Sequence, residues 1–204
     1  MKCSSLMKKP GVRLRYLARE VKSNLKPHLV ASTAMLAEAS PIFSAVELKL
    51  ADIAKETSLN NRAVCLGVTY LGGMGWLYER GRSFSRKMFD ITAKTREGVQ
   101  FVHDSLYTGL FTMAASPIIY TVAGERDVKK IAVGAVCAGA AGILNGPLMG
   151  YAVDAFLDLT GIKECERPSY PDLLKRRHPV VKKTLATLAT AASVAATAAI
   201  YASN

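Results

Sequence analysis

Six ionisable side chains stand inside or beside long uncharged stretches of this sequence, and they are the residues best placed to do chemistry. They are Glu38, Glu47, Glu79, His103, Asp104 and Asp154. Glu38 is the only charged residue between His28 and Val46. A carboxylate surrounded by apolar sequence is costly to bury, and it therefore marks a candidate site for a cation or a proton.

Catalysis is not indicated by these groups. His103 and Asp104 are adjacent, but neighbouring residues on a helix point about 100° apart, so we expect no catalytic dyad. The sequence has no nucleophile motif and no phosphate-binding loop, and its 4 cysteines lack metal-ligand spacing. We therefore expect no enzyme activity, no cofactor and no metal.

The elements that hold these residues are predicted to be membrane-spanning helices. Ser105 to Gly124 is a run of 20 uncharged residues and Ile131 to Val153 a run of 23, and a helix needs about 20 to cross a bilayer. A soluble core helix would show a polar face, whereas the second run has one strongly polar residue, Asn145. We predict an all-α, multi-span transmembrane helical bundle with spans at about 28–47, 63–79, 104–124 and 131–154, and a candidate fifth span at 184–204.

The basic residues alternate along the chain as a membrane topology requires. Lys and Arg number 8 before Pro27, 3 in 48–62, 6 in 79–100, 3 in 125–130 and 7 in 160–183. The positive-inside rule then places the N-terminus, 79–100 and 160–183 in the cytoplasm, in a multi-pass protein of the cell membrane. The basic, amphipathic residues 1–27 are expected to form a short interfacial helix, and the net charge of +11 favours anionic lipid and not nucleic acid as a partner.

Three short similarities suggest an internal repeat. "ASPIFSAV" at 39–46 returns as "ASPIIYTV" at 115–122, "AVCLG" at 63–67 as "AVCAG" at 135–139, and "GMGWLYE" at 73–79 resembles "LMGYAVD" at 148–154. Their order and nearly constant offset favour a duplicated helical hairpin. Two such hairpins would form parallel repeats about an axis along the membrane normal.

Small residues in the fourth predicted span favour close helix packing. Gly134, Gly142, Gly146 and Gly150, with Ala138 between them, recur every four residues along one face. The helix that packs there belongs either to the same chain or to a second copy, which would form a homodimer through the Gly142, Gly146 and Gly150 face.

Prolines stand in the predicted spans beside polar residues. Pro117 and Pro147 each free a backbone carbonyl inside the membrane, and Ser116 and Asn145 lie next to them. One interpretation is that broken helices line a polar cavity for a small solute. The other is a packed kink without a binding role.

The stretch from about His28 to Leu159 resembles the family of small L-alanine exporters, which are four-span membrane proteins. The matching motifs are "VELKLADIAKETSLNNRAV" with Glu47 and Arg62, "YER" with Arg80, "SPIIY" at 116–120 and "GPLMGYAVD" at 146–154. The basic start and residues 160–204 depart from the family pattern. The resemblance implies a protein of the cytoplasmic membrane that exports L-alanine or a similar small amino acid, driven by an ion gradient.

A zwitterionic substrate needs a carboxylate or free carbonyls for its ammonium group, and donors for its carboxylate. The residues predicted to bind it are Glu38, Ser116, Pro117, Asn145 and Pro147. Protonation of Glu38 or Asp104 would couple export to proton entry, by proton antiport. The alternatives are an oligomeric membrane protein that does not transport, and a channel for a small solute.

Overall fold

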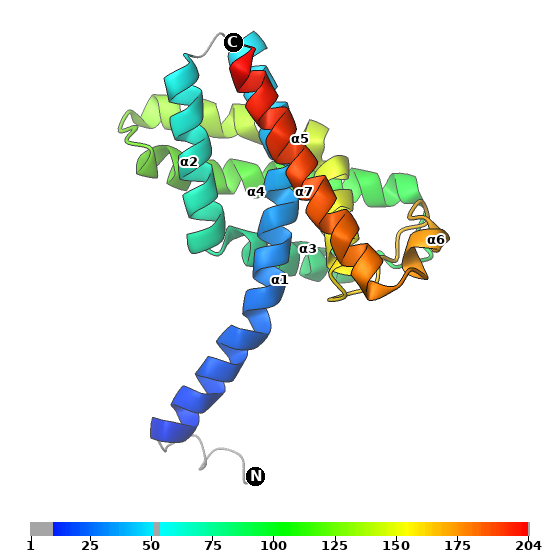
Figure 1. Cartoon of the computed structure of the whole chain (residues 1–204). Helices are drawn as coiled ribbons and strands as arrows, with labels where there is room; N and C mark the ends of the chain where they lie inside the picture. Colours follow the sequence, from blue (N-terminus) through cyan, green and yellow to red (C-terminus); the bar gives the residue numbers. More distant parts are fainter. Residues whose placement is uncertain (1–9, 51–53, 204) are drawn as a thin grey trace.

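The structure is a computed structural model that describes the backbone of residues 10–50 and 54–203 and the side chains of residues 24–49 and 54–203. Within these ranges the chain is helical and contains no strand, as Figure 1 shows. Its helices are α1 (Pro10–Ala45), the π-helix η2 (Val46–Leu50), α2 (Lys55–Leu71), α3 (Met74–Met88), α4 (Glu97–Val122), α5 (Val128–Leu159), α6 (Asp172–Lys175) and α7 (Pro179–Ala202).

Three of the described helical segments are long and apolar enough to cross a membrane, which indicates a membrane protein. They are Asn24–Lys49, Val128–Leu159 and Pro179–Ala202. Large apolar side chains such as Leu110 and Leu144 are exposed on the outside of the bundle, where lipid rather than water would cover them. The predicted span 104–124 lies in α4, whose apolar residues are interrupted by Ser, Thr, Tyr and Pro, and α4 is not one of the three.

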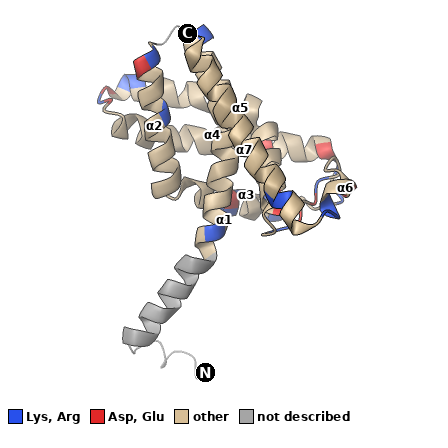
Figure 2. Ribbon diagram, viewed as in Figure 1, with Lys and Arg blue, Asp and Glu red and all other residues tan. Residues whose placement is uncertain are grey.

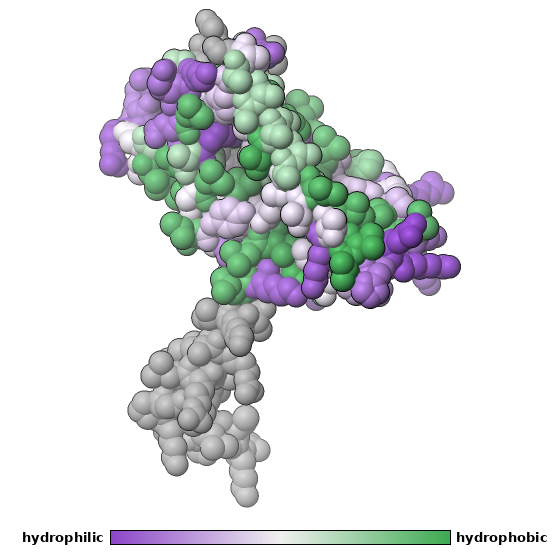
Figure 3. Space-filling view, in the orientation of Figure 1, coloured by the Kyte–Doolittle hydropathy of each residue, from purple (hydrophilic) through white to green (hydrophobic). Residues whose placement is uncertain are grey.

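Charged side chains gather at two opposite ends of the bundle, with apolar surface between them (Figures 2 and 3). We call one the hairpin end; it carries residues 46–50 and 54–62 and the turn 123–127 between α4 and α5, and Glu47, Arg62 and Ala123 line one cavity there. We call the other end the Arg167 end; it carries α3, the start of α4 and residues 160–183. Arg167 joins these elements, because it contacts Glu97 and Asp154. The basic segments 79–100 and 160–183 thus lie together.

The expected boundary at Pro27 is not a break in the helix. α1 runs from Pro10 to Ala45 and contains Pro27 and Pro41. A proline inside a helix removes one hydrogen bond but does not by itself end the helix. The described part of the basic segment is therefore continuous with the first predicted span, and residues 1–9 lie outside the described part of the chain.

The predicted second span, 63–79, is two helices and not one. α2 ends at Leu71, and Gly73 adopts a φ of 74°, a left-handed conformation that glycine tolerates, before α3 begins at Met74. His28 of α1 bridges the break, because its Nε2 contacts the carbonyl of Tyr70 (2.8 Å) and its Nδ1 accepts from the Trp76 N–H (3.1 Å). The imidazole satisfies backbone groups that the break leaves open.

The glycine face of α5 packs against α4 of the same chain. A Cβ on Gly146 would lie 2.5 Å from the Asp104 carbonyl oxygen, and one on Gly134 would lie 2.7 Å from the Tyr120 ring. A Cβ on Gly142 would likewise lie close to α4, at 3.0 Å from the Thr108 carbonyl oxygen. Of the two partners that the sequence leaves open for this face, the structure has the one in the same chain. The homodimer stays a prediction.

The two predicted hairpins differ in their packing. α4 and α5 contact each other along their lengths, whereas α1 contacts chiefly α7, α3 and α5. The hydrophobic core lies where α1, α3, α5 and α7 meet, around Ala34, Tyr78 and Val153. The second helix of the first predicted unit is divided at Gly73, unlike that of the second unit. The duplication stays a prediction.

Candidate functional site

A hydrogen bond joins Glu38 of α1 to Asn145 of α5. Asn145 Nδ2 donates to Glu38 Oε2 over 2.9 Å, although the two residues are 107 positions apart in the sequence. The other oxygen, Glu38 Oε1, is buried and has no hydrogen-bond partner among the described residues. Both residues lie in helices that are long enough to cross a membrane. Two of the residues predicted to bind substrate therefore meet, and one strong acceptor is left unfilled.

A mostly apolar cavity of about 240 Å³ adjoins this pair, between α1, α2, α4 and α5. It is lined by Ala39, the residue after Glu38, and by Ala138 and Met149. Asn145 lies seven residues after Ala138 and four before Met149, on the same face of α5. Glu38 and Asn145 are not themselves among the described lining residues, although residues close to them in α1 and α5 are.

The other predicted substrate residues have different surroundings. Ser116 is buried and lines the cavity, but its hydroxyl donates to the Thr112 carbonyl one turn earlier (2.7 Å). Pro117 and Pro147 lie inside α4 and α5, and both helices continue through them. The structure thus has no broken helix at either proline. Of the predicted substrate residues, Glu38 and Asn145 form the pair and Ser116 lines the cavity, whereas neither proline is among its described lining residues.

A buried cluster of charges closes the Arg167 end. Arg82 of α3 is 3 % exposed, and its guanidinium binds both Asp104 (2.8 and 2.9 Å) and Asp154 (2.8 and 2.8 Å). Arg167, from the segment after α5, donates from Nε to Asp154 Oδ2 (2.7 Å) and from Nη2 to Asp104 Oδ2. Arg86 adds a further contact to Asp154 at 3.2 Å. Guanidiniums and carboxylates alternate around this cluster, as buried charges require.

Arg82 and Arg167 lie outside the three membrane-length segments, and the neighbouring carboxylates control their ionisation. Burial alone would lower the pKa of the Arg82 guanidinium, but Asp154 and Asp104 raise it above its ordinary value. The same opposition of burial against Asp154 and Asp104 raises the pKa of Arg167. Both arginines therefore stay charged.

Asp104, a predicted proton-coupling residue, is a member of this cluster. Its Oδ1 accepts from Arg82 and contacts His103, and its Oδ2 accepts from Arg82 and Arg167. A Cβ added at Gly150 would lie 2.3 Å from Asp104 Oδ2. The carboxylate is thus enclosed by protein donors and by the α5 backbone.

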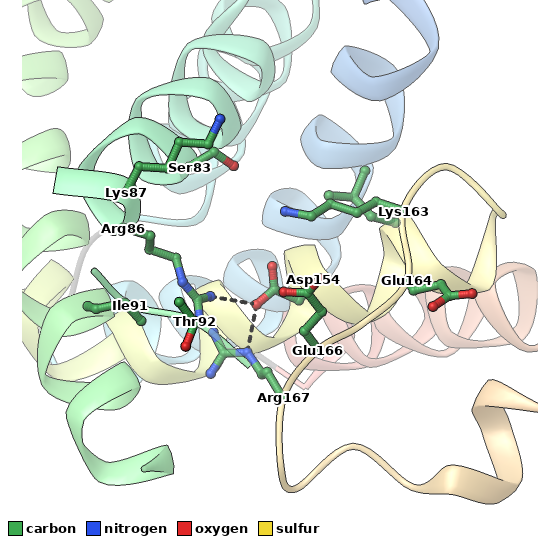
Figure 4. Close-up of a pocket in the computed structure, with 11 residues that line it drawn as sticks. Ser83, Arg86, Lys87, Ile91, Thr92, Asp154, Lys163, Glu164, Glu166 and Arg167 are labelled. Atoms are coloured by element: carbon green, nitrogen blue, oxygen red, sulfur yellow. Dashed lines mark hydrogen bonds and ion pairs between the residues drawn. The ribbon is translucent and has the colours of Figure 1, made fainter. Parts of the chain in front are cut away.

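A polar cavity of about 410 Å³ lies next to the cluster, and Figure 4 shows the side chains that line it. Asp154, Arg86 and Arg167 meet in it. The segment 160–171 forms one wall, and besides the contacts of Arg167 it makes two more: Tyr170 donates to Asp158 (2.9 Å) and the Ser169 N–H donates to Glu97 (3.2 Å).

His103 lies between a serine and an aspartate. Its Nε2 is 2.9 Å from Ser85 Oγ and its Nδ1 is 3.2 Å from Asp104 Oδ1. Although adjacent residues on a helix point in different directions, the His103 imidazole turns back to its own neighbour. Neither Ser85 nor His103 is among the described residues that line the two cavities, and both Asp104 oxygens already accept from arginines. A hydrolytic triad needs an accessible nucleophile and an oxyanion hole, so we assign no catalytic role.

A second ion pair stands at the hairpin end. Arg62 of α2 donates from Nη2 to Glu47 Oε1, in the π-helix η2. Ser58 donates to Glu47 Oε2 (2.6 Å), and the Tyr201 hydroxyl of α7 lies 2.7 Å from Ser58 Oγ and 3.3 Å from Ser44 Oγ. This network connects α1, α2 and α7.

Sequence reasoning missed the arginines that pair with the buried aspartates, Arg82 and Arg167. A carboxylate at the end of a predicted span, such as Asp154, indicates that a cation lies nearby. However, residues 79–100 carry 6 basic side chains and 160–183 carry 7, and no pattern distinguishes the paired ones.

A comparison of the chain with protein-family models, with curated proteins and with solved structures finds no significant match. The resemblance to the alanine exporters rests on the sequence motifs alone.

Proposed function

We propose that this protein is a membrane transporter that exports L-alanine or a similar small amino acid, and that Glu38 binds the ammonium group of the substrate. The observation that carries this proposal is the buried Glu38 Oε1, which has no hydrogen-bond partner among the described residues. A buried charged acceptor without a donor is costly. A substrate ammonium would supply donors there, while Asn145 holds the other oxygen.

The size and lining of the adjoining cavity support a small substrate. Its volume of about 240 Å³ lies below the range of roughly 300–1,000 Å³ that is usual for drug-sized ligands. Its mostly apolar lining includes Phe111 and Met149, which suit a short aliphatic side chain. A large or highly charged solute would lose its hydration there without finding enough partners.

The two ion clusters suit alternating closure of the two ends. The Arg82 cluster joins α3, α4 and α5 at the Arg167 end, and the Glu47–Arg62 pair joins η2 to α2 at the hairpin end. A transporter must open one end at a time around a central site. With the basic segments inside, the Arg167 end faces the cytoplasm and the hairpin end faces outward.

Proton antiport follows if the ammonium group and a proton compete for the same carboxylate. Glu38 has a free oxygen for either ligand, whereas both Asp104 oxygens already accept from guanidiniums. Of the two predicted coupling residues we therefore choose Glu38. An incoming proton would displace the amino acid on the outer side, and an amino acid would displace the proton on the inner side.

Purified protein in proteoliposomes tests the proposal. Wild-type protein should move L-alanine against its gradient when a pH gradient is imposed, and Glu38→Gln should abolish this movement. Glu56→Gln, which removes an exposed carboxylate at the hairpin end, is the matched control and should transport normally. Size-exclusion chromatography checks that each variant is folded.

The other functions predict different results in the same vesicles. A channel would let alanine equilibrate without following the pH gradient, and a protein that does not transport would give no flux. Full gradient-driven transport by Glu38→Gln would show that the assignment of Glu38 is wrong.

A further inference from the structure

The apolar cavity has a charged wall at its hairpin end. Glu47 and Arg62 are the two charged side chains among its described lining residues. Their side chains are 15 % and 16 % exposed, respectively. A guanidinium in an otherwise apolar wall is available to an anion that enters the cavity.

Arg62 has an unused donor in this wall. Its Nη2 binds Glu47, but its Nε is buried and has no hydrogen-bond partner among the described residues. The Phe43 ring lies 5.7 Å from the guanidinium carbon and covers one face of the cation. The free N–H group is therefore an unused donor beside this end of the cavity, whose described lining also includes Asn61.

Glu47 is positioned so that it binds Arg62 and leaves some of the N–H donors of the guanidinium unused. Ser58 fixes Glu47 Oε2 at 2.6 Å, and Tyr201 in turn lies 2.7 Å from Ser58. The Glu47 carboxylate thus contacts Arg62 through its other oxygen. The arginine is held in place by a network of side chains, and its Nε–H has no hydrogen-bond partner among the described residues.

We propose that Arg62 forms a carboxylate-binding subsite at the hairpin end of this cavity, for small apolar carboxylates. Guanidinium groups match carboxylates in geometry, and their charged hydrogen bonds are stronger than neutral ones. The apolar part of such a ligand would lie against Phe111 and Ile119 of the cavity wall. The role of this subsite in transport rests on the proposed function: in an exporter, the subsite receives the carboxylate of the exported amino acid.

The subsite is separate from Glu38. Glu38 and Glu47 are nine residues apart in α1 and η2, which corresponds to about 13 Å along a helix. A molecule as short as alanine does not span both groups. The substrate would leave Glu38 and then bind Arg62 on its way out, and competition from Glu47 would keep that second binding weak enough for release.

Binding of sodium propionate to the full chain in lipid nanodiscs, measured by calorimetry, tests the subsite without the ammonium group. Wild-type protein should bind propionate, and Arg62→Gln should weaken binding roughly tenfold or more. Arg126→Gln removes an exposed arginine at the same end and is the matched control, expected to leave binding unchanged.

The Glu47 variant separates a binding role from a structural one. If Arg62 binds the ligand, Glu47→Gln should retain or tighten propionate binding, and the double variant Glu47→Gln/Arg62→Gln should lose it. If the pair only holds α1 to α2, Glu47→Gln should be as damaging as Arg62→Gln, and the proposal is overturned. Absence of propionate binding by the wild-type chain would also overturn it.

The same variants distinguish failure of the subsite from failure of the proposed function. Alanine transport with an unchanged KM in Arg62→Gln would refute the subsite and leave the exporter proposal intact. Propionate binding that depends on Arg62, in a chain that moves no alanine, would support the subsite and refute the exporter.

Discussion

Replacing Arg167 with glutamine should open the segment after α5. Arg167 is 1 % exposed, and it links this segment to Asp104 of α4 and Asp154 of α5. The substitution removes one of the two guanidiniums that bind both aspartates, while Arg82 keeps its own contacts with them. The closed segment would then lie over a buried cluster with an uncompensated negative charge.

The size of the effect follows from the burial of the cluster. Removing one partner of a buried ion pair costs about 3–5 kcal/mol. We take the lower limit of about 3 kcal/mol, because Arg82 and Arg86 still neutralise part of the charge. Each 1.4 kcal/mol is about tenfold in an equilibrium constant, so the open fraction of the segment should rise about a hundredfold.

Cys165 reports this opening directly. It is 3 % exposed in the segment, and burial raises the pKa of its thiol to about 11, so the closed segment presents little thiolate to a maleimide. In a chain that keeps Cys165 as its single cysteine, Arg167→Gln should increase the labelling rate about a hundredfold, since labelling follows the open population.

The control for this experiment is Lys175→Gln, in the same segment. Lys175 pairs with Asp172 at the exposed surface, and the loss of that pair should leave labelling almost unchanged. The reasoning is refuted if Arg167→Gln labels no faster than wild type, or if Lys175→Gln labels equally fast.

Two further substitutions test how the helices are packed and connected, both by thermal unfolding in detergent. Gly150→Ala places a Cβ 2.3 Å from Asp104 Oδ2 and should lower the free energy of unfolding by about 1–3 kcal/mol. The added Cβ of Gly67→Ala meets nothing within 4 Å, and this variant should stabilise α2 by up to about 1 kcal/mol. Equal effects of the two substitutions would contradict the packing. Tyr201→Phe removes the hydroxyl that lies 2.7 Å from Ser58 and should cost about 0.5–1.5 kcal/mol; an unchanged melting temperature would show that this contact does not hold α7.

Much of the helical content and the Glu38 pair could be predicted because both depend on properties that a sequence displays. Long uncharged runs indicate membrane-length helices, and three of the described helical segments have that length and composition. A lone glutamate in one run and a lone asparagine in another each need a polar partner. Glu38 and Asn145 satisfy that need together, 2.9 Å apart.

The break in the second predicted span could not be read in the same way. Residues 63–78 are uncharged, and two adjacent glycines alone do not decide between a helix and a turn. The decision depends on His28, which comes from another helix and bonds to backbone on both sides of the break. Contacts between distant segments of this kind have no local signal in the sequence.

α7 is a helix of membrane length that polar contacts attach to the rest of the bundle. It consists mostly of alanine and threonine, which contribute little free energy on transfer into hydrocarbon. Three polar contacts attach it near its start, middle and end: Lys182 to the Asp158 carboxylate (2.9 Å), Ser193 to a carbonyl of α1 (2.5 Å), and Tyr201 to Ser58 (2.7 Å). The first is at the Arg167 end and the last supports the Glu47–Arg62 pair. α7 therefore contacts both ends of the bundle, through Asp158 at the Arg167 end and through Ser58 beside the Glu47–Arg62 pair.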